Sequence, residues 1–254
     1  LTTLGSLGGA RALDSRLRLG IGLAGFLALF GVVLAVWPEV NALAIIGPHP
    51  DSGGRFYGVT NLVETLLLVP ALVSGALLGV RWLLPIGALA VLVVGASRTG
   101  ADGGGVLVLV AGFLVLGAGL LGARPSLRTA FLLGAATVSL GLVAVGLDAA
   151  LGGSSHVVDA LADGPAGLAE DFERRMRLSA AVAFDSPLSV LALLVSLTIL
   201  ALLWPLRPRS PVRTALLAAI AVSLLANDAP TKVAGYGALA GLTLVAFEHT
   251  RRHA

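Results

Sequence analysis

Eight long apolar stretches, separated by short polar segments, follow one another along the chain. Crossing the hydrocarbon core of a bilayer takes about 20 helical residues, with a range of about 17–25. Only 12% of the residues are charged, whereas soluble domains carry about 25%. The sequence therefore predicts an all-α fold, a polytopic transmembrane helix bundle of about eight spans that forms a single integral membrane domain over residues 1–254. The predicted spans cover residues 19–37, 59–80, 82–96, 105–122, 129–147, 188–206, 212–226 and 233–247.

The charged residues between these spans differ in sign from one gap to the next. One set of alternate gaps, which includes both ends of the chain, holds eleven basic residues and two acids, and the other set holds six basic residues and twelve acids. Because cytoplasmic loops are enriched in Lys and Arg, this distribution predicts cytoplasmic termini and acidic extracytoplasmic loops. The basic clusters therefore indicate membrane topology and no nucleic-acid partner. Lysine is nearly absent, which is typical of a GC-rich bacterium such as an actinobacterium, so the predicted location is a bacterial plasma membrane.

Two of the connecting segments carry further structural predictions. One unbroken helix over residues 212–247 would be about 54 Å long at about 1.5 Å per residue, so two spans fit better than one helix broken at residues 227–230. The external loop 149–187 contains a predicted amphipathic helix at about residues 166–183, which suits the membrane interface. Three acid–base pairs at i, i+4 would stabilise this helix. They are Glu170–Arg174, Asp171–Arg175 and Glu173–Arg177. The first apolar run is long enough to be retained as a span rather than cleaved as a signal sequence.

A polar motif leads into the second predicted span and places an acid within apolar sequence. Asn61 and Glu64 are three residues apart and share a helix face. An ionisable residue inside a transmembrane helix costs about 2.5–3.5 kcal/mol on insertion scales and marks a functional site by default. Glu64 is therefore a candidate acid, base or proton carrier. The alternative is that Glu64 pairs with Arg55 or Arg98 and only holds helices together.

Two further motifs lie in predicted external loops. The turn that contains Arg98 and Asp102 is rich in glycine and precedes a helix, so its backbone N–H groups and Arg98 could hold an anion. In the long external loop, His156 is a candidate proton carrier or ligand, close in sequence to Asp159. A Ser/His/Asp hydrolase is not indicated, because no nucleophile-elbow sequence is present. The chain has no cysteine, which excludes thiol, disulfide and iron–sulfur chemistry, and no metal site is predicted.

The fourth motif contains Asn227, Asp228 and Lys232. Asp228 and Lys232, four residues apart, resemble the Asp/Lys pair in the last helix of microbial rhodopsins, where the lysine carries retinal. Pro230 between them and the small number of aromatic residues depart from that pattern, so no cofactor is predicted. Interrupted helices with polar residues also occur at transporter binding sites.

All four motifs lie in the acidic set of gaps, so the predicted topology brings them together on the extracytoplasmic side. There they would form a polar pocket, with cations suited to a phosphate or carboxylate and acids suited to a cation or proton. The candidate catalytic residues are Glu64, Asp228 and His156. The candidate substrate-binding residues are Arg55, Asn61, Arg98, Asp102, Asn227 and Lys232.

The ordered segments GRFYGVTNLVETLLL, SRTGADGGG and NDAPTK resemble a poorly characterised family of bacterial polytopic membrane proteins. In that family a GRFYG-x-x-N motif, a GAD-x-GG turn and an ND-[ST] motif recur in this order, often C-terminal to an alkaline-phosphatase-like domain. The resemblance covers residue 53 to the end and implies a cell-envelope role and a phosphatase-like or other envelope partner protein. It carries over Arg55, Asn61, Arg98, Asp102, Asn227 and Asp228 as signature residues without assigning them chemistry. The 254 residues contain no phosphatase-like domain, and residues 229–232 depart from the small-residue form of the last motif.

Three functions fit these predictions. The first is binding or processing of an anionic lipid-linked or phosphorylated substrate at the outer leaflet, together with a partner enzyme. The second is an ion- or proton-coupled transporter, and the third is a structural subunit of a homo- or hetero-oligomeric membrane complex. The sequence does not distinguish an enzyme from a binding protein. The acids in the external loops count against simple attraction of an anion, because they would repel phosphate unless paired.

Overall fold

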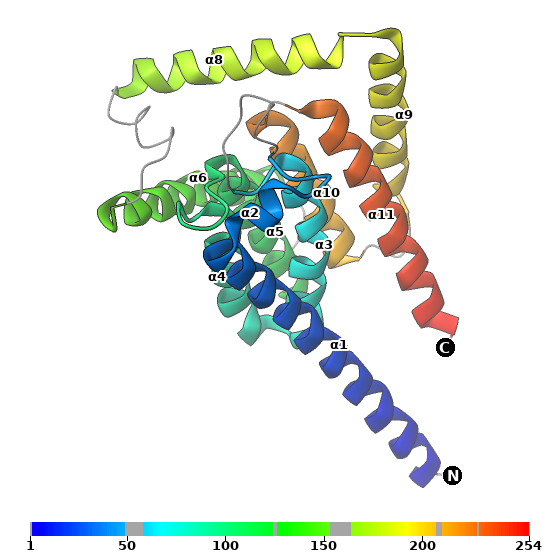
Figure 1. Cartoon of the computed structure of the whole chain (residues 1–254). Coiled ribbons are helices and arrows are strands. Elements are labelled where there is room, and N and C mark those ends of the chain that lie inside the picture. Colours follow the sequence, from blue (N-terminus) through cyan, green and yellow to red (C-terminus); the bar gives the residue numbers. More distant parts are fainter. Residues whose placement is uncertain are drawn as a thin grey trace.

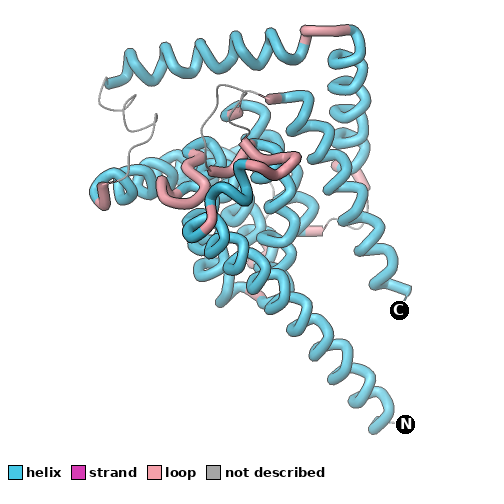
Figure 2. The backbone as a smooth tube through the Cα atoms, in the orientation of Figure 1, coloured by secondary structure: helices cyan, strands magenta, loops and turns pink. Residues whose placement is uncertain are grey.

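The computed structural model describes residues 2–48, 58–123, 126–152, 164–206, 210–227 and 229–253, and every regular element within these ranges is a helix. Figures 1 and 2 show these helices as a bundle, with one helix lying across an end of it. The helices are α1 (Thr2–Val36), α2 (Pro38–Ala42), α3 (Asn61–Leu78), α4 (Val80–Gly95), α5 (Gly103–Leu120), α6 (Leu127–Ala150), α8 (Gly164–Ala183), α9 (Pro187–Leu203), α10 (Pro211–Ala226) and α11 (Pro230–His253). The predicted all-α fold is confirmed for the described residues.

Each of the eight apolar stretches corresponds to one helix, but the helices differ in how well they suit a bilayer. Four are long and apolar enough to cross a membrane, namely α3, α5, α6 and the part of α1 from Asp14 to Val36. A fifth candidate consists of Phe172–Ala183 and Pro187–Leu203, which are bent by 105° relative to one another. Helices α4 and α10 are apolar but shorter. The structure thus contains four or five candidate spans, and the count of eight stays a prediction.

Short polar caps and prolines define where the helices begin. The hydroxyl of Ser186 accepts a hydrogen bond from the backbone N–H of Ser189 and so caps α9, which then starts with Pro187. Ser210 and Pro211 begin α10 in the same way. This arrangement is favourable because a serine oxygen satisfies a free N–H at the helix start, and proline has no N–H to satisfy there. Pro230 begins α11, so residues 227–229 separate two helices, as predicted.

Helices α3, α5 and α10 form the interior of the bundle. Gly112 of α5 faces Ala219 of α10 and Leu72 of α3, where an added Cβ would lie 3.3 Å from each neighbour. Small residues at such positions let helix backbones approach closely, which is how helices associate in a membrane. The outer helices instead expose large apolar side chains, such as Leu84 and Phe131. This inside-to-outside arrangement suits a protein whose outer surface contacts lipid.

Helix α8 lies across one end of the bundle, which we call the α8 end, and both chain termini lie towards the opposite end, which we call the terminus end (Figure 1). The structure places α8 at Gly164–Ala183, close to the predicted range. Of its predicted acid–base pairs, Glu173–Arg177 is present at 2.6 Å. Phe172 on this helix is exposed, as expected for a helix that rests on a membrane surface.

Candidate functional site

The loop that precedes α3 is joined to the turn between α4 and α5. The backbone N–H of Val59 donates to the carbonyl oxygen of Gly100 at 2.7 Å. Gly58 has φ +103°, and a Cβ at this position would lie only 2.4 Å from the Gly100 oxygen. A residue with a side chain would meet both backbone strain and a steric clash at this position. The glycines therefore bring two of the predicted motifs into direct contact.

Glu64 lies in the first turn of α3 and is completely buried. Thr60 caps this helix by accepting a hydrogen bond from the N–H of Val63, which fixes the position of the first turn. The Oε2 atom of Glu64 accepts a hydrogen bond of 2.8 Å from the side-chain amide of Asn227. Its Oε1 atom is buried, and no described residue offers it a hydrogen bond. A buried carboxyl oxygen without a donor is costly, so this atom is a candidate contact for a proton or a cation.

Asn227 directly follows α10 and connects three helices. Its side-chain nitrogen donates both to Glu64 and to the hydroxyl oxygen of Ser223, the latter at 2.7 Å. Its backbone carbonyl accepts a hydrogen bond of 3.1 Å from the hydroxyl of Ser179 on α8. Both N–H groups of the amide are therefore engaged, and its oxygen Oδ1 can accept a further contact. The site thus receives one further oxygen from Asn227.

Asp102 supplies a second carboxyl group at the start of α5. Its Oδ1 atom accepts a hydrogen bond of 3.0 Å from the N–H of Gly105 and caps the helix. The carboxylate of Asp102 also interacts electrostatically with Glu64. A Cβ on Gly104 would lie 2.6 Å from Asn227 Oδ1 and 3.4 Å from Asp102 Oδ1, so these two oxygens lie near one another. We call Glu64, Asp102, Asn227 and Ser223 the acid–amide cluster.

Two of the basic residues predicted for this site differ from the acid–amide cluster in their exposure. Arg98 and Lys232 are both exposed, whereas Glu64 is completely buried. Within the described ranges Glu64 forms no ion pair, so the alternative that Glu64 pairs with Arg98 is not supported. Asn61 is half-buried in the same turn as Glu64, and its carbonyl accepts a hydrogen bond from the Thr65 hydroxyl. Among the described residues, the buried part of the site therefore consists of carboxyl, amide and hydroxyl groups and contains no base.

Three of the predicted site residues lie outside the described residues, namely Arg55, His156 and Asp228. Asp159, which is close to His156 in sequence, lies outside them as well. The predicted meeting of motifs is consequently supported for three of the four segments, those around Glu64, Asp102 and Asn227. For the part of the chain that the structure describes, no group of three or more His, Cys, Asp or Glu residues is suited to a metal ion.

Several contributing residues were not predicted from the sequence. Ser179, Ser223 and Asn41 had no assigned role, yet Asn41 donates a side-chain hydrogen bond to the carbonyl of Gly58. Ser97 donates from its hydroxyl and its N–H to the carboxylate of Asp148, which ties the α4–α5 turn to α6. The spacing of Ser223, four residues before Asn227, places both on one helix face and could have indicated their contact. The other contacts join distant segments and have no local sequence signal.

A second buried carboxyl group lies at the terminus end. Glu248 of α11 accepts a hydrogen bond and ion pair of 2.9 Å from Arg213 of α10, and the two side chains are 16% and 5% exposed. Arg213 also donates to the carbonyl oxygen of Leu206 at 2.6 Å. This carboxylate has a base beside it, in contrast to Glu64.

The chain matches no protein-family model, and comparisons with curated proteins and with solved structures likewise give no match. The family resemblance of the three sequence motifs therefore stays a prediction.

Proposed function

We propose that this protein is a multi-pass protein of a bacterial plasma membrane with eight spans, cytoplasmic termini and the acid–amide cluster on the extracytoplasmic side. The sign of the charges in alternate gaps supports this topology. The position of both termini at the end opposite α8 agrees with it (Figure 1). The shorter helices α4 and α10 would need a locally thin bilayer or flanking residues that reach the interface, both of which membranes tolerate at modest cost.

Within this topology, the protein acts as a proton- or monovalent-cation-coupled carrier that binds the coupling ion at the acid–amide cluster. The observation that carries the proposal is the complete burial of Glu64 beside an amide rather than a base. A purely structural contact to Asn227 would be made equally well by glutamine, which has no ionised form to bury. A proton or a small cation would satisfy the Oε1 atom of Glu64 and reduce its repulsion with Asp102.

Ion binding at this site would affect the packing of several helices. The cluster takes its members from α3, α5 and α10, and the carbonyl of Asn227 contacts Ser179 of α8. Asn227 lies in the break between α10 and α11, and broken helices with polar ends are common at ion sites of secondary transporters. A ligand that favours one arrangement of these helices shifts the population toward it, which is the basis of coupled transport.

The test follows the protonation of Glu64 directly, without knowledge of the cargo. Infrared difference spectra of the detergent-solubilised chain after a pH or sodium step are expected to show a carboxyl band that is lost in Glu64→Gln. The matched control is Glu39→Gln, because Glu39 is an exposed acid in α2. Proton uptake by liposomes that contain the protein should fall in the same variant and persist in the control. A carboxyl band that survives in Glu64→Gln would refute the proposal.

Binding of an anionic lipid-linked or phosphorylated substrate for an envelope partner is the second candidate function. The exposure of Arg98 and Lys232 favours it, because both cations are accessible to a ligand at the rim of the bundle. In this case Arg98→Gln combined with Lys232→Gln would abolish binding of the substrate, and Glu64→Gln would not. If both sets of variants retained activity in a folded protein, a structural role in a membrane complex would be the better account.

A further inference from the structure

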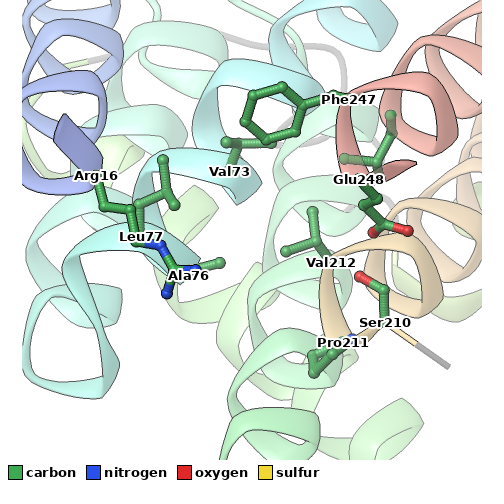
Figure 3. Close-up of a pocket in the computed structure, with 10 residues that line it drawn as sticks. Arg16, Val73, Ala76, Leu77, Ser210, Pro211, Val212, Phe247 and Glu248 are labelled. Atoms are coloured by element: carbon green, nitrogen blue, oxygen red, sulfur yellow. The ribbon is translucent and has the colours of Figure 1, made fainter. Parts of the chain in front are cut away.

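A groove of about 300 Å³ opens at the terminus end, between α1, α3, α10 and α11 (Figure 3). Its walls are apolar and come mainly from Val73 and Leu77 of α3, Val212 of α10, and Leu244 and Phe247 of α11. This end is remote from the acid–amide cluster, because Ser210 and Asn227 flank opposite ends of α10, a helix of 16 residues. At about 1.5 Å per residue the two positions are more than 20 Å apart. The groove is therefore a separate feature from the proposed ion site.

The polar side of the groove is basic. Arg16 extends from α1 beside Ala76 and Leu77 (Figure 3) and is exposed. The carboxylate of Glu248, which also lines the groove, is offset by its ion pair with Arg213 at 2.9 Å. The nearby carboxylate of Asp14 is offset by Arg18 at 2.7 Å. Among the described residues that line the groove, Arg16 is the one whose charge is not offset by an ion pair.

The start of α10 adds to this positive potential. Ser210 and Pro211 line the groove, and they are the N-cap and the first residue of that helix. The N-terminus of a helix carries a partial positive charge and favours a phosphate group. An anionic group held beside Arg16 would therefore face the positive end of α10 as well.

We propose that this groove binds one anionic phospholipid, with the phosphate beside Arg16 and the start of α10 and an acyl chain along the apolar wall. The segments that the charge pattern assigns to the cytoplasmic face hold most of the basic residues of the sequence, and anionic headgroups attract Lys and Arg at that face. Basic pockets between transmembrane helices on that face suit phospholipid headgroups. A lipid would cover the apolar wall with its acyl chain and place its phosphate beside Arg16, whereas a free phosphate would leave the apolar wall exposed.

The lipid would contact all four helices that line the groove. Its phosphate would lie between α1 and α10, and its chain would fill the space between α3 and α11. The wall residues Val73 and Leu77 belong to the same helix as Glu64. The site does not depend on the proposed ion binding, and either proposal can fail without the other.

The test measures lipid binding to the detergent-solubilised full chain by native mass spectrometry. Phosphatidylglycerol and phosphatidylcholine with identical acyl chains are titrated, and the ratio of singly bound to free protein is compared. The wild-type protein should bind phosphatidylglycerol more tightly. Arg16→Gln should weaken this binding about five-fold, the effect of one charge near a membrane surface, and leave phosphatidylcholine unchanged.

Arg128→Gln is the matched control, because Arg128 of α6 is exposed but does not line the groove. An equal loss of phosphatidylglycerol binding in Arg16→Gln and Arg128→Gln would overturn the proposal, since it would indicate only general charge attraction. Equal affinity of the wild-type protein for both lipids would overturn it as well. Ala76→Phe, which fills the groove, should weaken binding of both lipids, and its thermal unfolding midpoint shows whether the variant is folded. Glycerol 3-phosphate should not compete, because it has no acyl chain, and competition by it would indicate a site for free phosphate instead.

Discussion

The two ends of the bundle bury carboxyl groups in opposite ways. At the terminus end, Glu248 lies 2.9 Å from the guanidinium group of Arg213, so its negative charge is matched by a base. At the α8 end, Glu64 is more deeply buried, and its hydrogen-bond partner is the neutral amide of Asn227. Both arrangements connect α10 to another helix. Burial alone therefore does not distinguish the two acids, whereas the charge of the partner does.

A base beside a buried acid stabilises one arrangement of helices, because removal of either partner leaves an uncompensated charge. An amide beside a buried acid tolerates both the protonated and the ionised form, since it can donate or accept. The first arrangement suits a fixed joint and the second suits a site that changes its proton or cation occupancy. Four substitutions test this contrast.

The largest effect is expected for Arg213→Ala. This change leaves Glu248 buried without its base, and such a loss costs about 3–5 kcal/mol of unfolding free energy. Denaturant unfolding in detergent, followed by tryptophan fluorescence, measures it. Arg18→Ala is the control, because Arg18 and Asp14 form an exposed pair that should contribute less than about 1 kcal/mol. Equal effects of the two variants would show that the ion pair between Arg213 and Glu248 does not stabilise the fold.

Asn227→Leu should be less destabilising than Arg213→Ala. It should cost about 1–3 kcal/mol of unfolding free energy, because it leaves the buried Oε2 atom of Glu64 without a donor. The same unfolding experiment applies. Combining it with Glu64→Leu should recover much of the loss, since replacing both partners by apolar groups is close to neutral. A double variant that is less stable than Asn227→Leu alone would contradict this account.

Ser179→Ala removes the hydrogen bond between α8 and the carbonyl of Asn227. We expect a loss of about 0.5–1.5 kcal/mol in unfolding free energy and faster amide hydrogen exchange in α8. Ser196→Ala serves as the control, because the Ser196 hydroxyl bonds only to Ala192 of its own helix. Unchanged exchange in α8 would show that this contact does not hold the helix in place.

Glu64→Gln should have the smallest effect on stability, a change of less than about 1 kcal/mol in either direction, because a glutamine oxygen still accepts from Asn227. Glu248→Gln, by contrast, removes the charge that pairs with Arg213, and it should destabilise the protein by more than Glu64→Gln does. Thermal unfolding of both variants, measured side by side, gives the comparison. Strong destabilisation by Glu64→Gln would mean that the charge of Glu64 is structural, as that of Glu248 is.

Most of the helical architecture could be predicted from the sequence. Apolar runs are local signals, and the predicted spans begin within a few residues of the helix starts at Pro187, Pro211 and Pro230. The alternation of charge also led to the correct expectation that Glu64, Asp102 and Asn227 lie at one end of the bundle. These features depend only on the order of polar and apolar residues along the chain.

The partner of Glu64 could not be predicted in this way. The sequence predicts Arg55 or Arg98 as partners, of which Arg55 lies outside the described residues, and the hydrogen bond that the structure shows comes from Asn227, 163 residues away in the chain. Which residues meet depends on how each helix is rotated about its axis, and closely packed small residues such as Gly112 determine this rotation. Such information is distributed over many residues and is not visible in a local motif.

The backbone contact between Gly58 and Gly100 has a consequence for how loop-length changes would act on this protein. Val59 is held by Gly100, and Glu64 follows five positions later. Each residue of an α-helix turns the chain by about 100°. Inserting or deleting a single amino acid between Val59 and Glu64 would therefore turn the carboxyl group away from Asn227 and toward the direction that Val63 or Thr65 now takes, both of them buried. The length of the segment from Val59 to Glu64 is therefore as constrained as the identity of the acid at its end.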